Sequence, residues 1–460
     1  MWRKIIKDKE FTSSMTKIAV PVMLQSLITS SLNTLDTFMI TKLGTNSIAG
    51  VGLANQIFFF YSFILFGINT GASILFAQFY GANELDRVKK TLNYSLKFSI
   101  AVSIIFNILA YFIPEYLISL FTNDAAVITE GAKYMRVVSL SYIVTGMSFA
   151  IGIAMRSTGN ARSPFIASFV SFFVNAFFNY CFIFGKFGFP ALGVKGAAVG
   201  TIFARFTECF VLIYVIRRYR GPLYAKVKDL FSIDKDFRKY FVRVVTPVTI
   251  EETLWSLAQV VYGAIYAKIG VEATAAIQVA QAISNMLYVI ARGVSSASAV
   301  ILGIKIGENK LDRAHDMALK SLTVGFSSGV LLGSILIFIP HIFLRVFPDL
   351  TPGVRESARL ALMAFGLTYP FRMYNSVSIV GVFRGGGDVK YSMFLELFCS
   401  WFVGIPCAAI GVVFFGVPLW GALLLSSIDE VVKLAIGTPR ILKKKWIKSC
   451  LLYTSDAADE

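Results

Sequence analysis

The feature that most constrains this chain is a set of long stretches without a charged residue. Residues 137–155 and 321–339 are two such stretches, and each is close to the 20 or so apolar residues that cross a bilayer as a helix. Of the 460 residues, 56% are hydrophobic and 15% are charged, whereas soluble domains carry about 25% charged residues. The mean hydropathy is +0.68. These values exclude a soluble globular protein and predict an all-α, multi-pass membrane protein.

The chain is also basic, with 44 Lys and Arg against 27 Asp and Glu and a formal net charge of +17. We expect no nucleic-acid partner, because the sequence has neither a basic helix nor a zinc-binding spacing of the kind that contacts nucleic acid. In membrane proteins Lys and Arg are enriched in cytoplasmic loops, and here most lie in the loops on the side of the two termini. We therefore expect both termini in the cytoplasm. Residues 450–460 resemble a translated sequencing adapter, so we expect a non-native tail there.

Apolar runs between charged breaks or breaks marked by Gly and Pro predict twelve membrane-spanning helices. They lie near residues 12–42, 47–78, 93–113, 133–155, 163–185, 195–216, 241–268, 273–304, 319–339, 357–382, 391–415 and 419–439. The twelve helices divide into an N-terminal six-helix bundle (1–216), a cytoplasmic linker (217–240) and a C-terminal six-helix bundle (241–449).

The two bundles are copies of one unit. Residues 18–96 align with 244–322 without a gap at a shift of 226 residues, so that Pro21 meets Pro247 and Gly44 meets Gly270. Two halves in the same orientation are typical of secondary transporters, which work by alternating access with a pathway at the repeat interface. The sequence lacks a GxxxxGK[ST] loop, and we therefore do not expect ATP to drive transport.

Polar residues at membrane depth are expensive, and they are candidates for function. Asp36 lies in the first span, Asn175 and Asn179 share one face of the fifth, and Thr201 lies in the sixth. A carboxylate with amide and hydroxyl oxygens around it can exchange H⁺ or hold Na⁺, so we expect the coupling ion here and no other metal or cofactor. The alternative for the two Asn and the Thr is a purely structural hydrogen bond between helices. The counterparts of Asp36, the two Asn and the Thr in the second copy are different residues: Tyr262, Val403, Cys407 and Ser426.

Other charges within the spans have a different pattern. Arg205 and Glu208 are three residues apart on one helix, and their counterparts, Glu430 and Lys433, keep the pair with the signs reversed. We interpret both as local neutralising pairs.

The seventh span carries two adjacent acids, Glu251 and Glu252. We expect them to line the substrate path, with Arg292 and Arg372 as further candidates for that path and as basic partners of the acids. Pro21 and Pro247 are expected to bend their helices, either as static kinks or as flexing points.

Three motifs carry a family resemblance. Residues 35–44 (LDTFMITKLG) with 48–54 (IAGVGLA), the loop 80–83 (YGAN) and the turns at 156–160 and 384–388 resemble the multidrug and toxic compound extrusion (MATE) family of prokaryotes. The resemblance implies a V-shaped pair of six-helix bundles that exports amphipathic or cationic organic compounds in exchange for H⁺ or Na⁺.

The resemblance also implies roles for single residues. Asp36 matches the carboxylate that couples the cation in prokaryotic members. The family's fifth-span Asn-x-x-x-Asp is Asn175-x-x-x-Asn179 here, and this loss of a second carboxylate favours H⁺ over Na⁺. A tenth-span Asp of some members is also missing, and that span contains Arg372 instead.

Two alternatives remain within the class of carriers: a major-facilitator transporter, and a flippase for lipid-linked saccharides or another carrier of the same wider superfamily. An enzyme is not expected, because the two His, His315 and His341, lie apart and have no clustered catalytic partners. We expect a proton-coupled inner-membrane antiporter for small molecules, functional as a monomer in the plasma membrane of a prokaryote.

Overall fold

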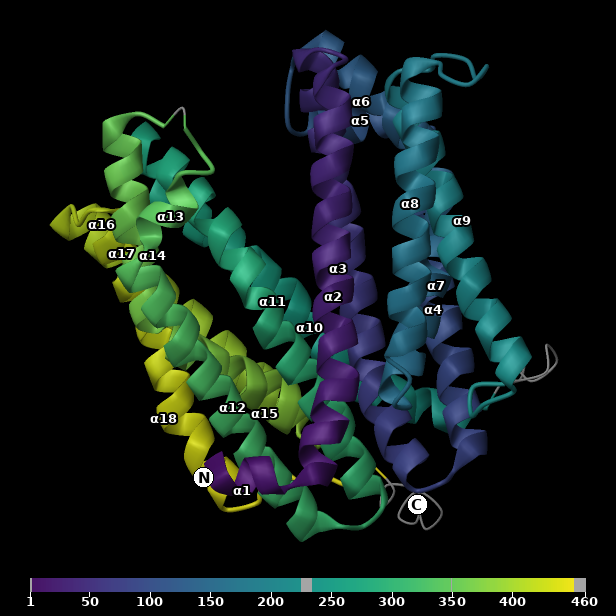
Figure 1. Cartoon of the computed structure of the whole chain (residues 1–460), viewed down its shortest axis with the longest axis vertical. Coiled ribbons are helices and arrows are strands. Elements are labelled where there is room, and N and C mark those ends of the chain that lie inside the picture. Colours follow the sequence, from purple (N-terminus) through teal and green to yellow (C-terminus); the bar gives the residue numbers. More distant parts are fainter. Residues whose placement is uncertain (1, 225–233, 349, 451–460) are drawn as a thin grey trace. The chain divides into compact units, whose positions relative to one another are not determined.

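The computed structural model describes residues 2–224, 234–348 and 350–450, and Asn33 only by its backbone. Part of the predicted linker, and all of the predicted tail except Cys450, lie outside the described residues. The described chain is nearly all helical (Figure 1). Its helices are α1 (Trp2–Lys7), α2 (Lys9–Thr41), α3 (Thr45–Gly81), α4 (Leu85–Phe112), α5 (Pro114–Ser119), α6 (Ala125–Val138), η1 (Ser139–Ser141), α7 (Tyr142–Ser157), α8 (Arg162–Phe184), α9 (Val194–Tyr219), α10 (Lys235–Ala267), α11 (Val271–Gly307), α12 (Leu311–Phe338), α13 (Pro340–Leu344), α14 (Pro352–Ser376), η3 (Val377–Arg384), α15 (Val389–Phe398), η4 (Cys399–Gly404), α16 (Ile405–Phe415), α17 (Leu419–Ser426) and α18 (Ile428–Leu442).

The helix boundaries confirm the repeat. The helices α2 and α10 have 33 residues each, α3 and α11 have 37, and α4 and α12 have 28. Each pair starts and ends at the same shift of 226 residues. The turns repeat as well: Asn83 and Asn309 have φ of 60° and 59°, in the left-handed region that Asn tolerates better than most residues. The predicted all-α fold of two six-helix halves is confirmed.

Nine helical stretches in the described part of the chain are long and apolar enough to cross a membrane. The remaining three predicted spans correspond to α10, to α14 with its π-helical continuation η3, and to α17 with α18. Among the described residues, these three contain five of the eight buried charged side chains: Glu251, Glu252, Arg384, Asp429 and Lys433. Charge therefore lowers the hydropathy of the segments in which ionisable groups pair with one another.

The contacts divide the chain into two units. The first contains residues 1–23, 77–83 and 250–460, and the second contains 24–76 and 84–249. Both α2 and α10 are therefore shared between the units, and each changes unit two residues after its proline, Pro21 or Pro247. The predicted bundle boundaries, 1–216 and 241–449, stay a prediction.

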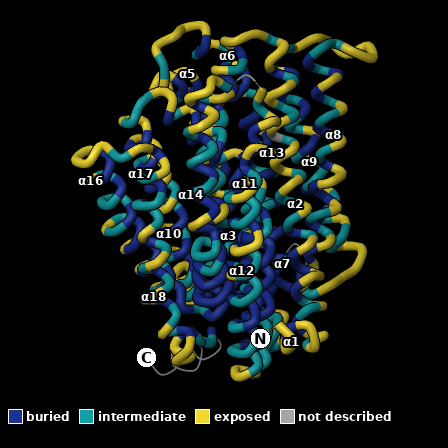
Figure 2. Tube along the Cα trace, turned by 60° about the vertical axis from the view of Figure 1, so that its left-hand side comes forward, coloured by how far each residue is buried: buried dark blue, intermediate teal, exposed yellow. Residues whose placement is uncertain are grey.

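Within the second unit, α8 and α9 run side by side (Figure 1). Gly196 and Gly200 lie where α9 meets α8, and a Cβ at either position would collide with Phe182 or Asn179. Two glycines four residues apart let helices approach closely in a membrane. The neighbouring α7 is buried along most of its length (Figure 2). These contacts fix the helices that carry the polar residues of the fifth and sixth spans.

Each of the helices α2 and α10 begins with an aspartate that has two roles. Asp8 accepts a hydrogen bond from the backbone N–H of Phe11, and its carboxylate contacts Arg313 Nη2 at 2.6 Å and Lys320 Nζ at 2.5 Å, all within the first unit. The Arg313 guanidinium beside Asp8 holds the pKa of that carboxyl well below its usual range. In the second unit, Asp234 caps α10 through Phe237 and contacts Lys90 Nζ at 2.6 Å, and Lys90 lowers the pKa of Asp234.

We expect Asp8→Asn to lower the thermal unfolding temperature in detergent by a few degrees, because Asn keeps the capping oxygen but loses the ion pairs. The folded protein releases this proton more readily than the unfolded chain. The stabilisation is therefore complete above the usual aspartate pKa of about 4 and is lost as the pH falls below it. Asp312→Asn, in an exposed pair with Lys444, is the control. An equal loss of stability in both variants would contradict the stabilising role assigned to the ion pairs of Asp8.

Candidate functional site

Three of the predicted site residues form one cluster in the second unit. Asn179 Nδ2 donates a hydrogen bond to Asp36 Oδ1 at 2.6 Å and a second to Asn175 Oδ1 at 3.0 Å. Both asparagines are completely buried, and Asp36 is partly buried. The helices α2 and α8 thus bring the carboxylate and the two amides together, as their depth in the sequence predicted.

The cluster is polar but not fully satisfied. Asn175 Nδ2 and Asn179 Oδ1 are buried and have no hydrogen-bond partner among the residues that the structure describes. A buried polar atom without a partner costs about 1–3 kcal/mol, and such atoms call for an explanation such as a bound ion or water. The two free amide atoms beside one carboxylate provide capacity for a small ligand.

The hydroxyl of Thr201 makes its hydrogen bond within its own helix, α9. It donates to the carbonyl of Ala197 at 3.0 Å, and the hydroxyl of Tyr134 lies near it. Tyr134 is buried on α6, and its hydroxyl interacts with the charge of Asp36. Sequence analysis missed Tyr134, because an aromatic residue at a span end is indistinguishable from a packing residue.

The predicted pair of Arg205 and Glu208 is confirmed, with Arg205 Nη1 3.0 Å from Glu208 Oε2. Its reversed counterpart also exists but is looser, with Lys433 Nζ 3.7 Å from Glu430 Oε1. Lys433 has closer partners in Glu396 Oε1 at 2.8 Å and Asp429 Oδ2 at 3.1 Å. Glu396 was not predicted, since it comes from another helix, α15.

The two adjacent acids of the seventh span are buried in the first unit and share one arginine. Arg384 Nη2 contacts Glu251 Oε1 at 3.0 Å, Arg384 Nη1 contacts Glu252 Oε1 at 2.5 Å, and Ser392 also donates to Glu251. The basic partners predicted from the sequence were therefore wrong. The guanidinium of Arg372 lies 5.2 Å from the ring centroid of Phe365, and Arg292 is exposed.

Both repeats use the same arginine contact. In the second unit Arg156 Nη2 donates to Gln25 Oε1 at 2.9 Å, and Gln25 and Arg156 are the counterparts of Glu251 and Arg384. The contacted residue lies four positions after the helix proline in each case. Pro21 and Pro247 are each inside a continuous helix, and the arginine holds the turn that follows the proline.

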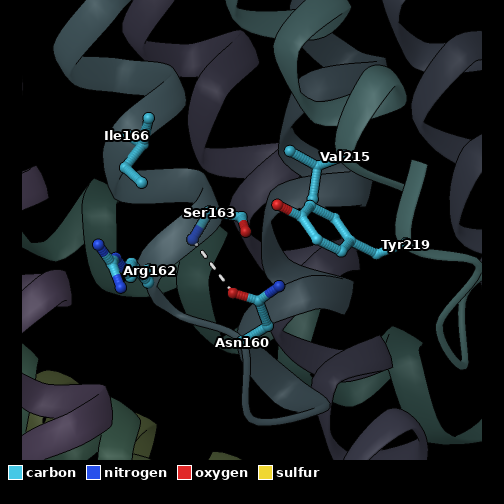
Figure 3. A pocket seen from close by; sticks show the side chains of 6 residues that line it. All are labelled: Asn160, Arg162, Ser163, Ile166, Val215 and Tyr219. Atoms are coloured by element: carbon cyan, nitrogen blue, oxygen red, sulfur yellow. Dashed lines mark hydrogen bonds between the residues drawn. The ribbon is translucent and has the colours of Figure 1, made fainter. Parts of the chain in front are cut away.

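A pocket of about 400 Å³ lies elsewhere in the second unit, between the start of α8 and the end of α9. Figure 3 shows its lining, in which the side chain of Asn160 accepts a hydrogen bond from the backbone N–H of Ser163 at 3.1 Å. The lining also contains Arg162, Ile166, Val215 and Tyr219. None of the predicted site residues lines this pocket.

Two copies of a six-helix membrane unit, with a carboxylate–amide cluster in one copy, define a two-repeat membrane transporter. The chain belongs to the MatE family, whose model matches residues 21–181 and again 247–410. The two matches begin at the two helix prolines, 226 residues apart. The resemblance to the MATE family is therefore confirmed, and the family accounts for most of the chain.

Individual relatives agree with this assignment. A probable multidrug resistance protein NorM of Thermotoga maritima is 26% identical over 444 residues, which cover 96% of this chain and 95% of that protein. The uncharacterised transporter YisQ of Bacillus subtilis is 22% identical and covers 96% of both chains.

Solved structures share the fold. An outward-facing multidrug resistance MATE transporter of the MOP superfamily superposes with a TM-score of 0.84 at 19% identity, covering 94% of this chain and 96% of that one. A MOP superfamily transporter from Pyrococcus furiosus, described as having a binding pocket of reverse polarity, has a TM-score of 0.82 at 20% identity with the same coverage.

Proposed function

We propose that this chain is a secondary active antiporter that exports amphipathic or cationic organic compounds in exchange for H⁺, with Asp36 as the coupling carboxylate. The multidrug resistance name of the Thermotoga maritima relative supports the substrate class. We place the protein in the plasma membrane of a prokaryote as a monomer, with both termini in the cytoplasm.

The observation that carries the proposal is the hydrogen bond from Asn179 Nδ2 to Asp36 Oδ1. It places a titratable group against a buried amide pair that still has one free donor and one free acceptor. A carboxyl in such surroundings changes its hydrogen bonds when it gains or loses a proton, because the protonated form donates and the ionised form only accepts. The cluster therefore responds structurally to the coupling ion.

The charge of the cluster favours H⁺ over Na⁺. The asparagines contribute oxygens but no negative charge, and Asp36 supplies the single carboxylate of the cluster. Na⁺ keeps its full charge in a site and needs several oxygen ligands around it, so a second carboxylate would strengthen Na⁺ binding by Coulomb attraction. A proton needs one carboxylate only. Thr201, hydrogen-bonded to Ala197, contributes to the shape of the site rather than to its charge.

The two prolines supply a route from ion binding to alternating access. Each lies in a helix that is shared between the two units and that changes unit two residues later. A proline removes one backbone hydrogen bond and so weakens the helix locally. We propose Pro21 and Pro247 as flexing points, and Glu251, Glu252, Arg292 and Arg372 as residues of the substrate path.

The choice of ion can be tested in proteoliposomes with a panel of fluorescent cationic dyes. We expect dye transport to follow an imposed pH gradient in Na⁺-free buffer and to collapse by at least tenfold when the gradient is dissipated. Adding Na⁺ on either side should change the rate by less than twofold. A strict Na⁺ requirement would contradict H⁺ coupling, and a failure to move any dye would contradict the substrate class.

A further inference from the structure

The pair of Arg205 and Glu208 is held more firmly than a neutralising pair requires. Glu208 Oε1 accepts a hydrogen bond from Ser168 Oγ at 2.8 Å while Glu208 Oε2 contacts Arg205. Ser168 in turn accepts from Gln25 Nε2 at 2.9 Å, and Gln25 accepts from Arg156. Four helices, α2, α7, α8 and α9, thus fix the position of one carboxylate.

The arginine of this pair acts electrostatically on Asp36. Arg205 lines a small pocket together with Thr29 and Leu32 of α2. Asp36 lies four residues, about one helical turn, beyond Leu32 on the same helix, so the two charges are close enough to interact.

Among the described residues, a further cation of this network is Arg156, which is separated from Glu208 by Gln25 and Ser168. The nearby hydroxyls and thiol are Tyr134, which interacts with Asp36 and Arg205, Tyr61, which interacts with Arg205, and Cys209, which interacts with Glu208. Tyrosine and cysteine are neutral near pH 7 unless they are strongly activated. Arg205 is therefore the basic group that acts on Asp36 in this part of the structure, and Glu208 is its partner.

Little solvent reaches the pair of Arg205 and Glu208. A pocket of about 20 Å³ lies between Thr29, Ser168, Ser171, Arg205 and Glu208, with Ile28 and Leu32 completing its lining. This volume is enough for about one water molecule. The side chains of Arg205 and Glu208 are only 20% and 12% exposed, so bulk water and salt screen their charges weakly.

The second repeat shows that the fold does not require these signs. At the equivalent positions it has an acid, Glu430, and a base, Lys433. A pair that served only to neutralise charge would work in either order. The order of base and acid along the helix matters only if the base must lie close to another carboxylate. The first repeat has such a carboxylate, Asp36, and the second repeat has Tyr262 at that position.

We propose that Arg205 and Glu208 are positioning residues for proton exchange at Asp36: Glu208 offsets the charge of Arg205, and the balance between the two sets the pH range over which Asp36 exchanges its proton. This inference rests on the proposed coupling role of Asp36. It adds that the sixth span tunes the site without itself carrying the proton.

Infrared spectroscopy of the purified full-length protein tests this directly, because a protonated carboxyl has a C=O band that an ionised carboxylate lacks. The band of Asp36 is assigned by its loss in Asp36→Asn and then titrated in each variant background. As a general scale, a single charge about 10 Å from a carboxyl, at an effective dielectric constant of about 20, shifts the pKa of that carboxyl by about one unit.

We expect opposite shifts from the two members of the pair. Glu208→Gln leaves Arg205 unbalanced and should move the half-point of the Asp36 band about one unit lower. Arg205→Gln leaves Glu208 unbalanced and should move it about one unit higher. The double variant Arg205→Gln with Glu208→Gln, and the conservative Glu208→Asp, should both return to within about 0.3 units of the parent.

Glu115→Gln is the matched control, since it makes the same chemical change in an exposed pair with Arg136 and should leave the half-point unchanged. A half-point that stays the same in all variants, or that moves in one direction for both single variants, would overturn this inference alone. If Asp36→Asn removes no titrating band, the proposed coupling fails and this inference fails with it.

Discussion

Asp36→Asn is expected to reduce drug export to the level of cells without the transporter while the protein still inserts and folds. The substitution keeps the size of the side chain and its ability to accept a hydrogen bond from Asn179 Nδ2, but it removes the group that gains and loses a proton. The measurement is the minimum inhibitory concentration of a drug and dye panel in an efflux-deficient host, together with the amount of protein in the membrane.

Two further variants test whether the loss of export is due to the loss of the titratable carboxyl group. Asn179→Asp adds a second carboxylate beside Asp36 and Asn175, and we expect it to change the ion dependence rather than to abolish export. Asp36→Glu retains the titratable group and should retain part of the activity. Full resistance in Asp36→Asn at normal membrane levels would show that coupling does not depend on this residue.

Arg384→Gln is expected to destabilise the protein by about 3–5 kcal/mol, because removing one partner of a buried ion pair leaves the other charge uncompensated. Here two carboxylates are affected. Glu251 is 0% exposed and Glu252 8%, and both contact the guanidinium. The measurement is thermal unfolding in detergent, alongside the yield of folded protein.

A second variant distinguishes the loss of charge balance from a general loss of packing. Arg384→Gln combined with Glu251→Gln and Glu252→Gln should recover most of the lost stability, because no buried charge is then unpaired. Arg359→Gln, in the exposed pair with Glu356, should have little effect. A triple variant as unstable as Arg384→Gln would show that the arginine acts through packing and not through its charge.

Much of the fold follows from local features of the sequence. The apolar runs predict the spans, and the shift that aligns Pro21 with Pro247 also reproduces the ends of three pairs of helices. The helices α4 and α12 start about eight residues before the predicted spans at 93–113 and 319–339. Their first turns are charged, as at Asp86 and Asp312, and hydropathy marks the apolar part of a helix rather than its end.

The sequence predicted the parts of the site that depend on how deep a residue lies in its span. It did not predict the contacts that depend on packing between distant helices. Asp36, Asn175 and Asn179 lie together because their depths and helix faces match. The predicted basic partners of Glu251 and Glu252 were wrong, because several arginines lie at a suitable depth in the sequence. Only the packing of the η3 segment brings Arg384 to α10. Gly196 and Gly200 are a visible signal for the close contact of α8 and α9 that sequence analysis did not use.

The most direct test of proton coupling at Asp36 is to measure proton movement while a substrate crosses the membrane. Proteoliposomes containing a pH indicator, in Na⁺-free buffer, receive an outwardly directed gradient of a dye that the transporter carries. The wild-type protein should move protons inward as the dye leaves, and Asp36→Asn should move neither. Dye export without proton movement in the wild type, or unchanged proton movement in Asp36→Asn, would contradict the role assigned to this carboxylate.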